Sequence, residues 1–286
     1  MKQILQVISL FAWPRRSGAR VVYDLLGANN NIAEQSLYLN MGYWEEAETY
    51  DDACEALARR LGESAELGSD DEVLDAGFGF GDQDIFWIEN FRPQRICGLN
   101  PSPKQVEHAQ KRVAERGLSD RIELQVGSAT DIPYAADSFD KIISLEAAFH
   151  FVTREDFFSD AYRVLRPGGR IAIADMTPLE GRRLRAVERI GDYLGRRIWQ
   201  IPQANMYGRA PYIEKLRAAG FESIEWRSIR ELVYAPFARY ARQRLNDPVV
   251  VERMHPLMRA YWKASTANDR AYDPLDYAII TAEKAR

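Results

Sequence analysis

Short apolar runs alternate with amphipathic segments along the chain from about residue 71 onward. The apolar runs predict β-strands at 73–76, 95–99, 122–126, 141–145, 170–174, 221–229 and 276–281. The amphipathic segments predict helices at 102–117, 156–165 and 212–219. Ser102 suits the N-cap of the first of these helices, Pro103 its first turn and Gly117 its end. Strands alternating with helices predict an α/β fold, in which a parallel sheet is covered by helices on both faces.

Two parts of the chain fall outside this alternation. Residues 1–70 carry no strand pattern and predict an N-terminal helical lid. Residues 179–210 and 233–270 are helical in pattern and rich in aromatic side chains. Open α/β sheets bind ligands beyond the carboxyl ends of their strands, so these two segments are expected to cover a substrate site. Residues 71–178 then form the core, and 211–232 and 271–286 supply its remaining helix and strands.

Composition narrows the class of protein. Of the 286 residues, 46% are hydrophobic and 28% are charged, which is ordinary for a globular protein. Two cysteines are too few for a disulfide scaffold or for a cysteine-based zinc site. The net charge of −4 argues against a nucleic-acid partner.

The charge is unevenly distributed along the chain. Residues 180–260 contain 16 Lys and Arg against 9 Asp and Glu, an excess of +7 on an otherwise acidic chain. Solvated helical surfaces account for most charge of this kind. As a minority hypothesis, the segment recognises an anionic acceptor through Arg182, Arg183, Arg185, Arg196 and Arg197.

The N-terminus is the one stretch that resembles a targeting segment. Residues 4–13 are mostly apolar, but they are too few to span a bilayer, which takes about 20 residues. No small-residue cleavage site follows them, so we expect a helix or arm packed on the body rather than a signal peptide. The expectation is therefore a cytoplasmic protein with no integral membrane association.

A glycine-rich turn follows the first predicted strand, in the stretch Asp75-Ala-Gly77-Phe-Gly79-Phe-Gly81. Its glycines permit a tight turn and close approach of the backbone to a ligand. A dinucleotide fingerprint has glycine where this chain has Asp82, and a carboxylate at a helix start would repel a pyrophosphate. The turn therefore favours a nucleoside ligand without phosphates. S-adenosylmethionine fits, because Asp75 can favour its ammonium group and aromatic faces its sulfonium.

Several motifs in a fixed order carry a resemblance to a known family. They are LDAGFGFGDQD, GLNPSPKQVEHA, GSATDIPYAADSFDKIISLEAAFHF, and RVLRPGG followed by IADMTP. Together they resemble the class I S-adenosylmethionine-dependent methyltransferases, which implies a Rossmann-like, seven-stranded, mostly parallel sheet. The upstream YLNMGYW is similar to the lid of small-molecule methyltransferases of the natural-product-tailoring, tocopherol-type and sugar O-methylating kinds.

The resemblance implies a role for individual residues in binding S-adenosylmethionine. The three turn glycines face its methionine and ribose, with Gln83 assisting, and Asn100 holds the ribose hydroxyls where the family usually has an acid. Residues Ser128, Ala129 and Thr130 lie at the adenine, and Glu146 lies where the methionine tail and sulfonium meet the substrate. The lid aromatics Tyr38, Tyr43 and Trp44 close over the cofactor, or else pack as ordinary helix-face side chains.

Two residues are candidates for catalysis. His150 follows the fourth strand, and its side chain can take a proton from a substrate hydroxyl near neutral pH. Asp175 ends the fifth strand at the same edge and can orient that imidazole, as a histidine and an acid do in related O-methyltransferases. The alternative is that His150 only packs under the ligand. His108 and His255 are expected to be a surface and a structural residue, so we predict no catalytic metal, although a carboxylate-bound magnesium stays open.

The sequence thus predicts methyl transfer to a small, largely apolar acceptor. Its pocket is expected to use aromatic side chains, although each fits core packing equally well: Phe149, Phe151, Trp199, Tyr207 and Tyr212. Oxygen is the favoured methylated atom because of His150. The rivals are C-methylation of a prenyl-like or aromatic molecule, and a cyclase or binding protein that holds the cofactor without methylating. A dehydrogenase is disfavoured by Asp82 and Asn100, and the oligomeric state is left open.

Overall fold

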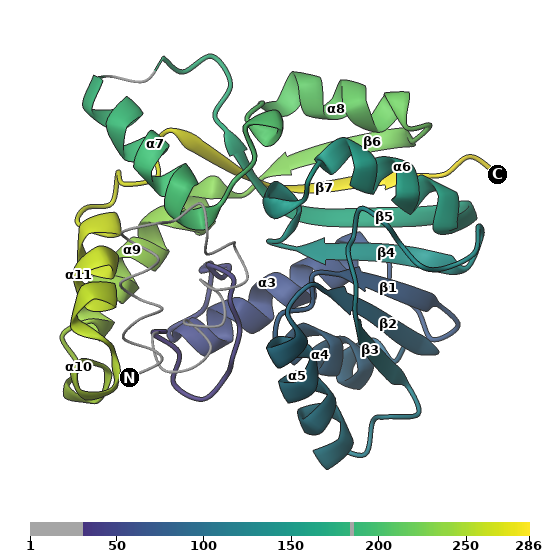
Figure 1. Cartoon of the computed structure of the whole chain (residues 1–286), viewed down its shortest axis with the longest axis horizontal. Helices are drawn as coiled ribbons and strands as arrows, with labels where there is room; N and C mark the ends of the chain where they lie inside the picture. The colour runs from purple at the N-terminus through teal and green to yellow at the C-terminus, as the bar shows by residue number, and fades with distance from the viewer. Residues whose placement is uncertain (1–30, 184–185) are drawn as a thin grey trace.

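A seven-stranded sheet in the order β3-β2-β1-β4-β5-β7-β6 forms the centre of the computed structural model, which describes residues 31–183 and 186–286 (Figure 1). Strands β1 to β5 are parallel, and β7 runs antiparallel to both β5 and β6. The strands are β1 Glu72–Ala76, β2 Arg95–Asn100, β3 Ile122–Val126, β4 Phe139–Leu145, β5 Leu165–Pro178, β6 Glu222–Ser228 and β7 Leu275–Glu283. The predicted α/β fold is confirmed.

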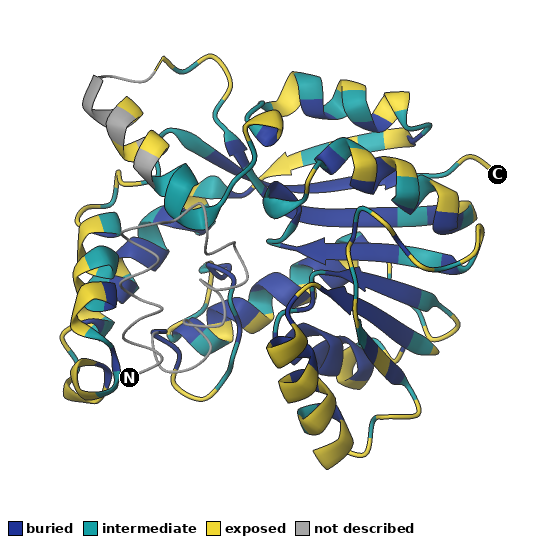
Figure 2. Cartoon of the chain, in the orientation of Figure 1, coloured by how far each residue is buried: buried dark blue, intermediate teal, exposed yellow. Residues whose placement is uncertain are grey.

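Helices cover both faces of the sheet, and each face has its own apolar core. On one face lie α3 Tyr50–Ser64, α4 Asp82–Asn90 and α5 Pro103–Glu115, packed against alternate strand residues such as Val73 and Ile143. On the other lie α6 Arg154–Val164 and α8 Arg209–Ala218, packed against the intervening residues such as Leu74 and Ile142. The inner strands are consequently largely buried on both sides, which Figure 2 shows as a dark central layer, whereas the edge strand β6 is mostly exposed.

Side-chain caps begin several helices where the sequence places them. Ser102 accepts a hydrogen bond from Gln105 N at the start of α5, with Pro103 in the first turn. Thr153 and Asp156 form a capping box at the start of α6. These local signals position the connections that follow β2 and β4, and both connections leave from the edge of the sheet where the parallel strands end.

Of residues 1–70, which the sequence predicts to be helical, residues 50–64 do form the helix α3, whereas the prediction is wrong for residues 31–49. Residues 31–49 (the lid segment) contain no helix, and the first described helix begins at Tyr50. The segment instead satisfies its backbone N–H groups with carboxylates from elsewhere in the fold. The amides of Gln35 and Ser36 donate to Asp51, that of Leu37 to Asp82 and that of Met41 to Glu146.

Four helices lie beyond the carboxyl ends of the parallel strands, on the left of Figure 1. They are α7 Ala186–Trp199, α9 Tyr234–Arg244, α10 Pro248–Arg253 and α11 Pro256–Ser265, with the short 3₁₀ turn η2 Gln203–Asn205 between α7 and α8. No helix among residues 31–183 and 186–286 is long and apolar enough to cross a membrane. The apolar N-terminal stretch at 4–13 lies outside the described residues.

The glycine-rich turn packs tightly against the chain that follows β4. Gly77 has φ +104°, and a Cβ added there would lie 2.4 Å from the Cβ of Ala147. Gly117, after α5, also has a positive φ of +68°, but a Cβ added there would meet nothing within 4 Å. Substitutions at the two positions therefore distinguish the cost of a positive φ, which both share, from the cost of steric crowding, which only Gly77 has.

We expect Gly117→Ala to lower the free energy of unfolding by about 1–2 kcal/mol, the cost of a left-handed non-glycine residue. Gly77→Ala adds to this strain an overpacking cost of about 1–3 kcal/mol. Urea denaturation of both variants measures the difference. Equal losses for the two variants would show that Gly77 is not crowded by Ala147.

Candidate functional site

A cavity of about 820 Å³ opens at the edge of the sheet where the parallel strands end (the carboxyl edge). The lid segment, the ends of β4 and β5, and α7 and α11 surround it. Its wall is rich in apolar and aromatic side chains, among them Tyr38, Phe149, Trp199 and Tyr272. A cavity of this size and lining accommodates a ligand of several rings.

The buried side chains of one asparagine and one threonine on the cavity wall each have a polar atom with no hydrogen-bond partner among the described residues. These atoms are Nδ2 of Asn40, from the lid segment, and Oγ1 of Thr177, near the end of β5. Both side chains are at most 4% exposed. Buried polar groups are nearly always paired in native proteins, so a bound ligand or an ordered water is expected to supply the partner of each atom.

The glycine-rich turn begins at Asp75, whose carboxyl group is completely buried. Gln83 donates from Nε2 to Oδ2 of Asp75 at 3.0 Å, whereas Oδ1 has no partner among the described residues. Burial raises the pKa of Asp75, and it also raises that of the neighbouring Asp84, whose carboxyl group lies within hydrogen-bonding reach. Two buried carboxyl groups so close share a proton, and a cation bound at the turn would stabilise their ionised form.

Asp82 was expected to repel a pyrophosphate, but in the structure its carboxylate binds other parts of the protein. Arg112 binds both of its carboxylate oxygens, at 2.6 and 2.8 Å, and neutralises its charge. The Leu37 amide also donates to it at 3.3 Å. Asp82 therefore holds the lid segment and α5 against the turn, and with its charge neutralised it would repel a pyrophosphate less than its sequence position predicts.

Asn100 is committed to contacts within the protein. Its Nδ2 donates to Gly79 O and to Gln105 Oε1, and its Oδ1 accepts from Ser102 N. Next to it, Nε2 of the buried Gln105 has no partner among the described residues. The sequence reasoning missed Gln105. The sequence feature that could have drawn attention to Gln105 is its place as the third helical residue after the Ser102 N-cap, where a Gln is typical of a capping box.

The residues expected at the adenine form a compact turn after β3. Ser128 and Thr130 share a hydrogen bond between their hydroxyl groups at 2.8 Å, and Thr130 N donates to Ser128 Oγ. Ala129 between them is buried. This turn follows β3, and the glycine-rich turn follows β1. Both strands are parallel and flank β2, so the two turns lie at the same carboxyl edge.

Only one of the three lid aromatics lies on the cavity wall. Tyr38 does, and its hydroxyl contacts Asp82 O at 3.4 Å. Tyr43 instead donates to Glu45 beneath the guanidinium of Arg60. The Trp44 ring lies 5.0 Å from that of Tyr240 on α9, and its Nε1 donates to Met41 O. Tyr43 and Trp44 therefore hold the lid segment on the body by packing, although not from a helix face as the alternative expected.

Glu146 follows β4 and faces the cavity. Its Oε2 accepts hydrogen bonds from Met41 N at 2.8 Å and from the Tyr277 hydroxyl at 2.7 Å. Burial raises the pKa of Glu146 to about 8, more than these two hydrogen bonds lower it. Its φ of +53° is in the left-handed region, which is strained for a glutamate.

His150 ends the 3₁₀ turn η1 Ala148–His150 and does not lie on the cavity wall. Its ring packs 4.1 Å from that of Phe149, and its side chain hydrogen-bonds to the backbone of Trp199. Phe149 and Trp199 themselves line the cavity. Burial and the nearby Arg154 guanidinium lower the pKa of His150 to about 3. The imidazole is therefore neutral at physiological pH.

The expected pairing of Asp175 with His150 is not formed. Asp175 is fully buried and binds Arg154 Nε at 2.8 Å, the Tyr212 hydroxyl at 3.1 Å and its own following amide, that of Met176. Arg154 is itself 1% exposed and also donates to Asn205 O and Met176 O. A buried guanidinium needs an ionic partner, and this demand takes the carboxylate away from the imidazole.

Asn205 connects this buried ion pair to the turn that carries His150. Its Nδ2 donates to the carbonyl oxygens of Phe149 and Phe151 at 3.1 and 2.7 Å, and its Oδ1 accepts from Arg154 N. Asp175 is thus connected through Arg154 and Asn205 to the backbone on either side of His150, and not to the imidazole itself. Sequence reasoning had no signal for Asn205, because it lies about 50 residues away in the cover segment.

The five aromatics expected in the acceptor pocket divide into two groups. Phe149 and Trp199 line the cavity. Phe151 packs edge-on against Phe157, Tyr207 covers Arg154, and Tyr212 is completely buried against Asp175. The last three belong to the core on the α6 and α8 face, and none of them is on the cavity wall.

The arginines of the basic segment are largely engaged by other groups. Arg182 lies 3.7 Å from Asp273, Arg196 donates to Gln203 and Arg197 to the Tyr193 hydroxyl. Of these, Arg196 lines the cavity. Arg183 is exposed, and Arg185 lies outside the described residues. Within the described residues, no group of three His, Cys, Asp or Glu could hold a metal ion.

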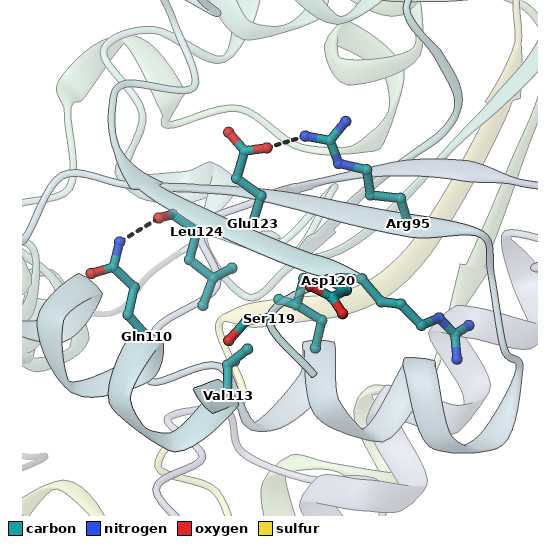
Figure 3. Close-up of a pocket in the computed structure, with 9 residues that line it drawn as sticks. Arg95, Gln110, Val113, Ser119, Asp120, Glu123 and Leu124 are labelled. Atoms are coloured by element: carbon teal, nitrogen blue, oxygen red, sulfur yellow. Dashed lines mark hydrogen bonds and ion pairs between the residues drawn. The ribbon is translucent and has the colours of Figure 1, made fainter. Parts of the chain in front are cut away.

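A second hollow, of about 430 Å³, lies between α5 and the start of β3 (Figure 3). Charged and polar side chains surround it, and Arg95 pairs with Glu123 while Gln110 donates to Leu124 O. It lies at the ends of the strands opposite to the carboxyl edge. The cavity beside the glycine-rich turn is therefore the candidate site.

Known proteins with similar sequences identify the family. Residues 73–169 match the family model described as a methyltransferase domain. The chain is 36% identical to the erythromycin 3''-O-methyltransferase of Saccharopolyspora erythraea, over 99% of this chain and 97% of that protein. It is 27% identical to the 27-O-demethylrifamycin SV methyltransferase of Amycolatopsis mediterranei, over 86% and 89% of the two chains. The chain is a class I S-adenosylmethionine-dependent methyltransferase.

Solved structures agree with this family at the level of the fold. The crystal structure of the [4+2]-cyclase SpnF has a TM-score of 0.73 with 23% identity, over 94% of this chain and 96% of that one. A geranyl diphosphate methyltransferase in complex with S-adenosylmethionine has a TM-score of 0.65 with 19% identity, over 83% and 88%. The predicted methyl donor, S-adenosylmethionine, and the predicted enzyme class are confirmed, and the dehydrogenase hypothesis is set aside.

The residues of this methyltransferase fit S-adenosylmethionine. A Cβ added at Gly79 would meet only Leu39 at 3.5 Å, so the turn leaves room for a ligand against its backbone. At the same turn, the buried carboxyl groups of Asp75 and Asp84 are suited to a cationic ligand, which would stabilise their ionised form. The amide of Gln105, in the first turn of α5 shortly after β2, has a donor nitrogen without a partner among the described residues.

We expect Arg154→Met to lower the free energy of unfolding by about 3–5 kcal/mol, because it leaves the Asp175 carboxylate buried without its cation. The exposed pair of Arg116 with Glu89 is the matched control, and Arg116→Met should cost about 1 kcal/mol or less. Urea denaturation measures both. A loss for Arg154→Met as small as that of the control would contradict the assignment of a buried ion pair.

Proposed function

We propose that this methyltransferase transfers a methyl group to a hydroxyl oxygen of a bulky, largely apolar natural product that carries a sugar or another ring substituent. The cavity of about 820 Å³ carries the proposal, because it joins the carboxyl edge to a space large enough for several rings. Two relatives named for erythromycin and a rifamycin, both of them large natural products, support it.

Oxygen is preferred to carbon as the methylated atom. The relatives that match most of this chain are O-methyltransferases, whereas the C-methyltransferases of geranyl diphosphate are 17–19% identical and support the fold alone. The unpaired Thr177 hydroxyl on the wall suits an oxygen-bearing acceptor. The alternative of an anionic acceptor has less support, since Arg196 is the one described arginine of the proposed anion-binding set that lies on the wall.

Residues of this chain would hold the cofactor at the carboxyl edge. We assign Gly77, Gly79, Gly81, Asp75 and Gln83 to its methionine and ribose, and Ser128, Ala129 and Thr130 to the adenine side, with Tyr38 above it. Bound there, S-adenosylmethionine supplies a methyl group on a positively charged sulfur. The protein contributes by holding the acceptor oxygen in line with that methyl group, which is a large part of the rate enhancement in such reactions.

Catalysis by His150 stays a prediction. Its neutral imidazole can accept a hydrogen bond, but it lies behind Phe149 and Trp199, and Asp175 does not support it. We assign Asp175 the role of anchoring Arg154, and through it Asn205 and the η1 turn. The cytoplasmic location and the lack of a nucleic-acid partner likewise stay predictions from composition.

The acceptor class is tested by incubating the enzyme with S-adenosylmethionine and a panel of glycosylated macrocycles, their aglycones, prenyl diphosphates and small phenols. Mass spectrometry with fragmentation locates any added methyl group. We expect O-methylation of a sugar or ring hydroxyl among the macrocycles. Methylation at carbon, or of the prenyl diphosphates alone, would contradict the proposal.

Thr177→Val tests whether the unpaired hydroxyl on the cavity wall binds the acceptor. The variant keeps the shape of the side chain and removes a buried polar group that lacks a partner, so the free energy of unfolding should stay the same or rise. The KM for the acceptor should rise about tenfold, as expected for one lost hydrogen bond. A drop in stability with an unchanged KM would show that the hydroxyl has a structural role instead.

A further inference from the structure

We propose that Glu146 accepts the proton of the acceptor hydroxyl during methyl transfer, an inference that rests on the proposed O-methylation. Sequence reasoning assigned Glu146 to the cofactor and the proton to His150. In the structure, Glu146 and not His150 lines the cavity. Of the described residues that line the cavity, Glu146 is the only one with a carboxyl group, while His150 is not on the wall at all.

The carboxylate has one occupied oxygen and one available oxygen. Its Oε2 is held by Met41 N and by the Tyr277 hydroxyl, at 2.8 and 2.7 Å. Its Oε1 receives no hydrogen bond from the described residues, so it can bind a ligand group. The two donors fix the orientation of the carboxyl group in advance, which a proton acceptor requires if it is to meet the hydroxyl in a productive geometry.

The backbone of Glu146 supports the same role. A glutamate at φ +53° is strained, and such strain persists where the surrounding structure holds the residue in place. Here Glu146 N donates to Ala174 O at 2.8 Å on the neighbouring strand β5. The residue is thus fixed by β5, β7 and the lid segment together, at the point where the cofactor edge meets the acceptor space.

The groups facing Glu146 are uncharged or already paired. They are Tyr50 and Cys54 from α3, Asp175 from β5, Tyr234 from α9, Tyr272, and Tyr277 from β7. Burial raises the pKa of each of these tyrosines and of the cysteine, and Asp175 is bound to Arg154. With no described cation beside it, Glu146 has a pKa raised to about 8, close to the pH at which a proton acceptor works best.

The step balances in atoms and charge. The acceptor oxygen forms a C–O bond to the methyl carbon as the C–S bond breaks, and the bonding electron pair stays on sulfur, which becomes a neutral thioether. The hydroxyl proton moves to Glu146 Oε1. One positive sulfonium and one negative carboxylate are consumed together, so the buried site carries no net charge afterwards. The protonated Glu146 then returns its proton to water.

Glu146→Gln tests the proposal, because the amide oxygen can still accept from Met41 N and Tyr277 while the side chain no longer takes a proton. We expect kcat to fall at least about a hundredfold, within the range for loss of a proton acceptor. The Kd for S-adenosylhomocysteine, which has no sulfonium charge, should stay within about threefold by isothermal titration calorimetry. The exposed Glu48→Gln is the matched control and should leave both values unchanged.

Each outcome decides between defined alternatives. An unchanged kcat in Glu146→Gln, together with a large loss in His150→Asn, would overturn the proposal and restore His150 as the base. A loss of S-adenosylhomocysteine affinity with an unchanged kcat would make Glu146 a cofactor residue only. If the wild-type enzyme methylates no hydroxyl acceptor, it is the proposed function that fails. Circular dichroism and the Tm verify folding, and Glu146→Asp, which withdraws the carboxylate, replaces the Gln variant if that variant is unfolded.

The pH dependence of kcat/KM of the wild-type enzyme is a second test of Glu146 as the proton acceptor. A proton acceptor works in its deprotonated form, so the raised pKa of Glu146 predicts kcat/KM that rises with pH and levels off above about 8. His150, with its pKa lowered to about 3, would already be deprotonated throughout. A profile that is flat from about pH 6 to pH 9 would therefore contradict Glu146 as the base.

Discussion

Two hydrogen bonds to Oε2 of Glu146 join three parts of the chain that are far apart in sequence. Met41 N comes from the lid segment, the Tyr277 hydroxyl from β7, and the carboxylate itself from the end of β4. The central sheet brings β4 and β7 together on either side of β5, and the hydrogen bond to Met41 then places the lid over the carboxyl edge. This one carboxylate thus ties the lid segment, which forms part of the cavity wall, to β4 and β7.

Much of the fold follows from local patterns in the sequence. The seven strands lie where short apolar runs predict them, and α5 and α6 begin at recognisable caps. The lid segment was beyond such reasoning. Its amides bind Asp51, Asp82 and Glu146, which are up to 105 residues away, so no pattern within residues 31–49 could reveal that it forms no helix. Pairings over such separations depend on the tertiary structure.

The same division holds for the candidate site. The order of motifs leads to the family, the cofactor and the edge of the sheet where both substrates bind. Individual roles depend on which polar groups satisfy one another inside the protein. Asp175 is taken by the buried Arg154, Asn100 by the glycine-rich turn, and Asp82 by Arg112. The residues left with unused hydrogen-bonding capacity, among them Thr177 and Gln105, could be recognised only after these internal bonds were known.

The central claim is that Glu146, rather than His150, meets the acceptor hydroxyl. A crystal structure of the enzyme with S-adenosylhomocysteine and the unmethylated acceptor tests it most directly. We expect the reacting hydroxyl oxygen to lie within about 3.2 Å of Glu146 Oε1, which is hydrogen-bonding distance. An acceptor whose reacting oxygen contacts the His150 imidazole, with Glu146 turned toward the cofactor alone, would contradict it.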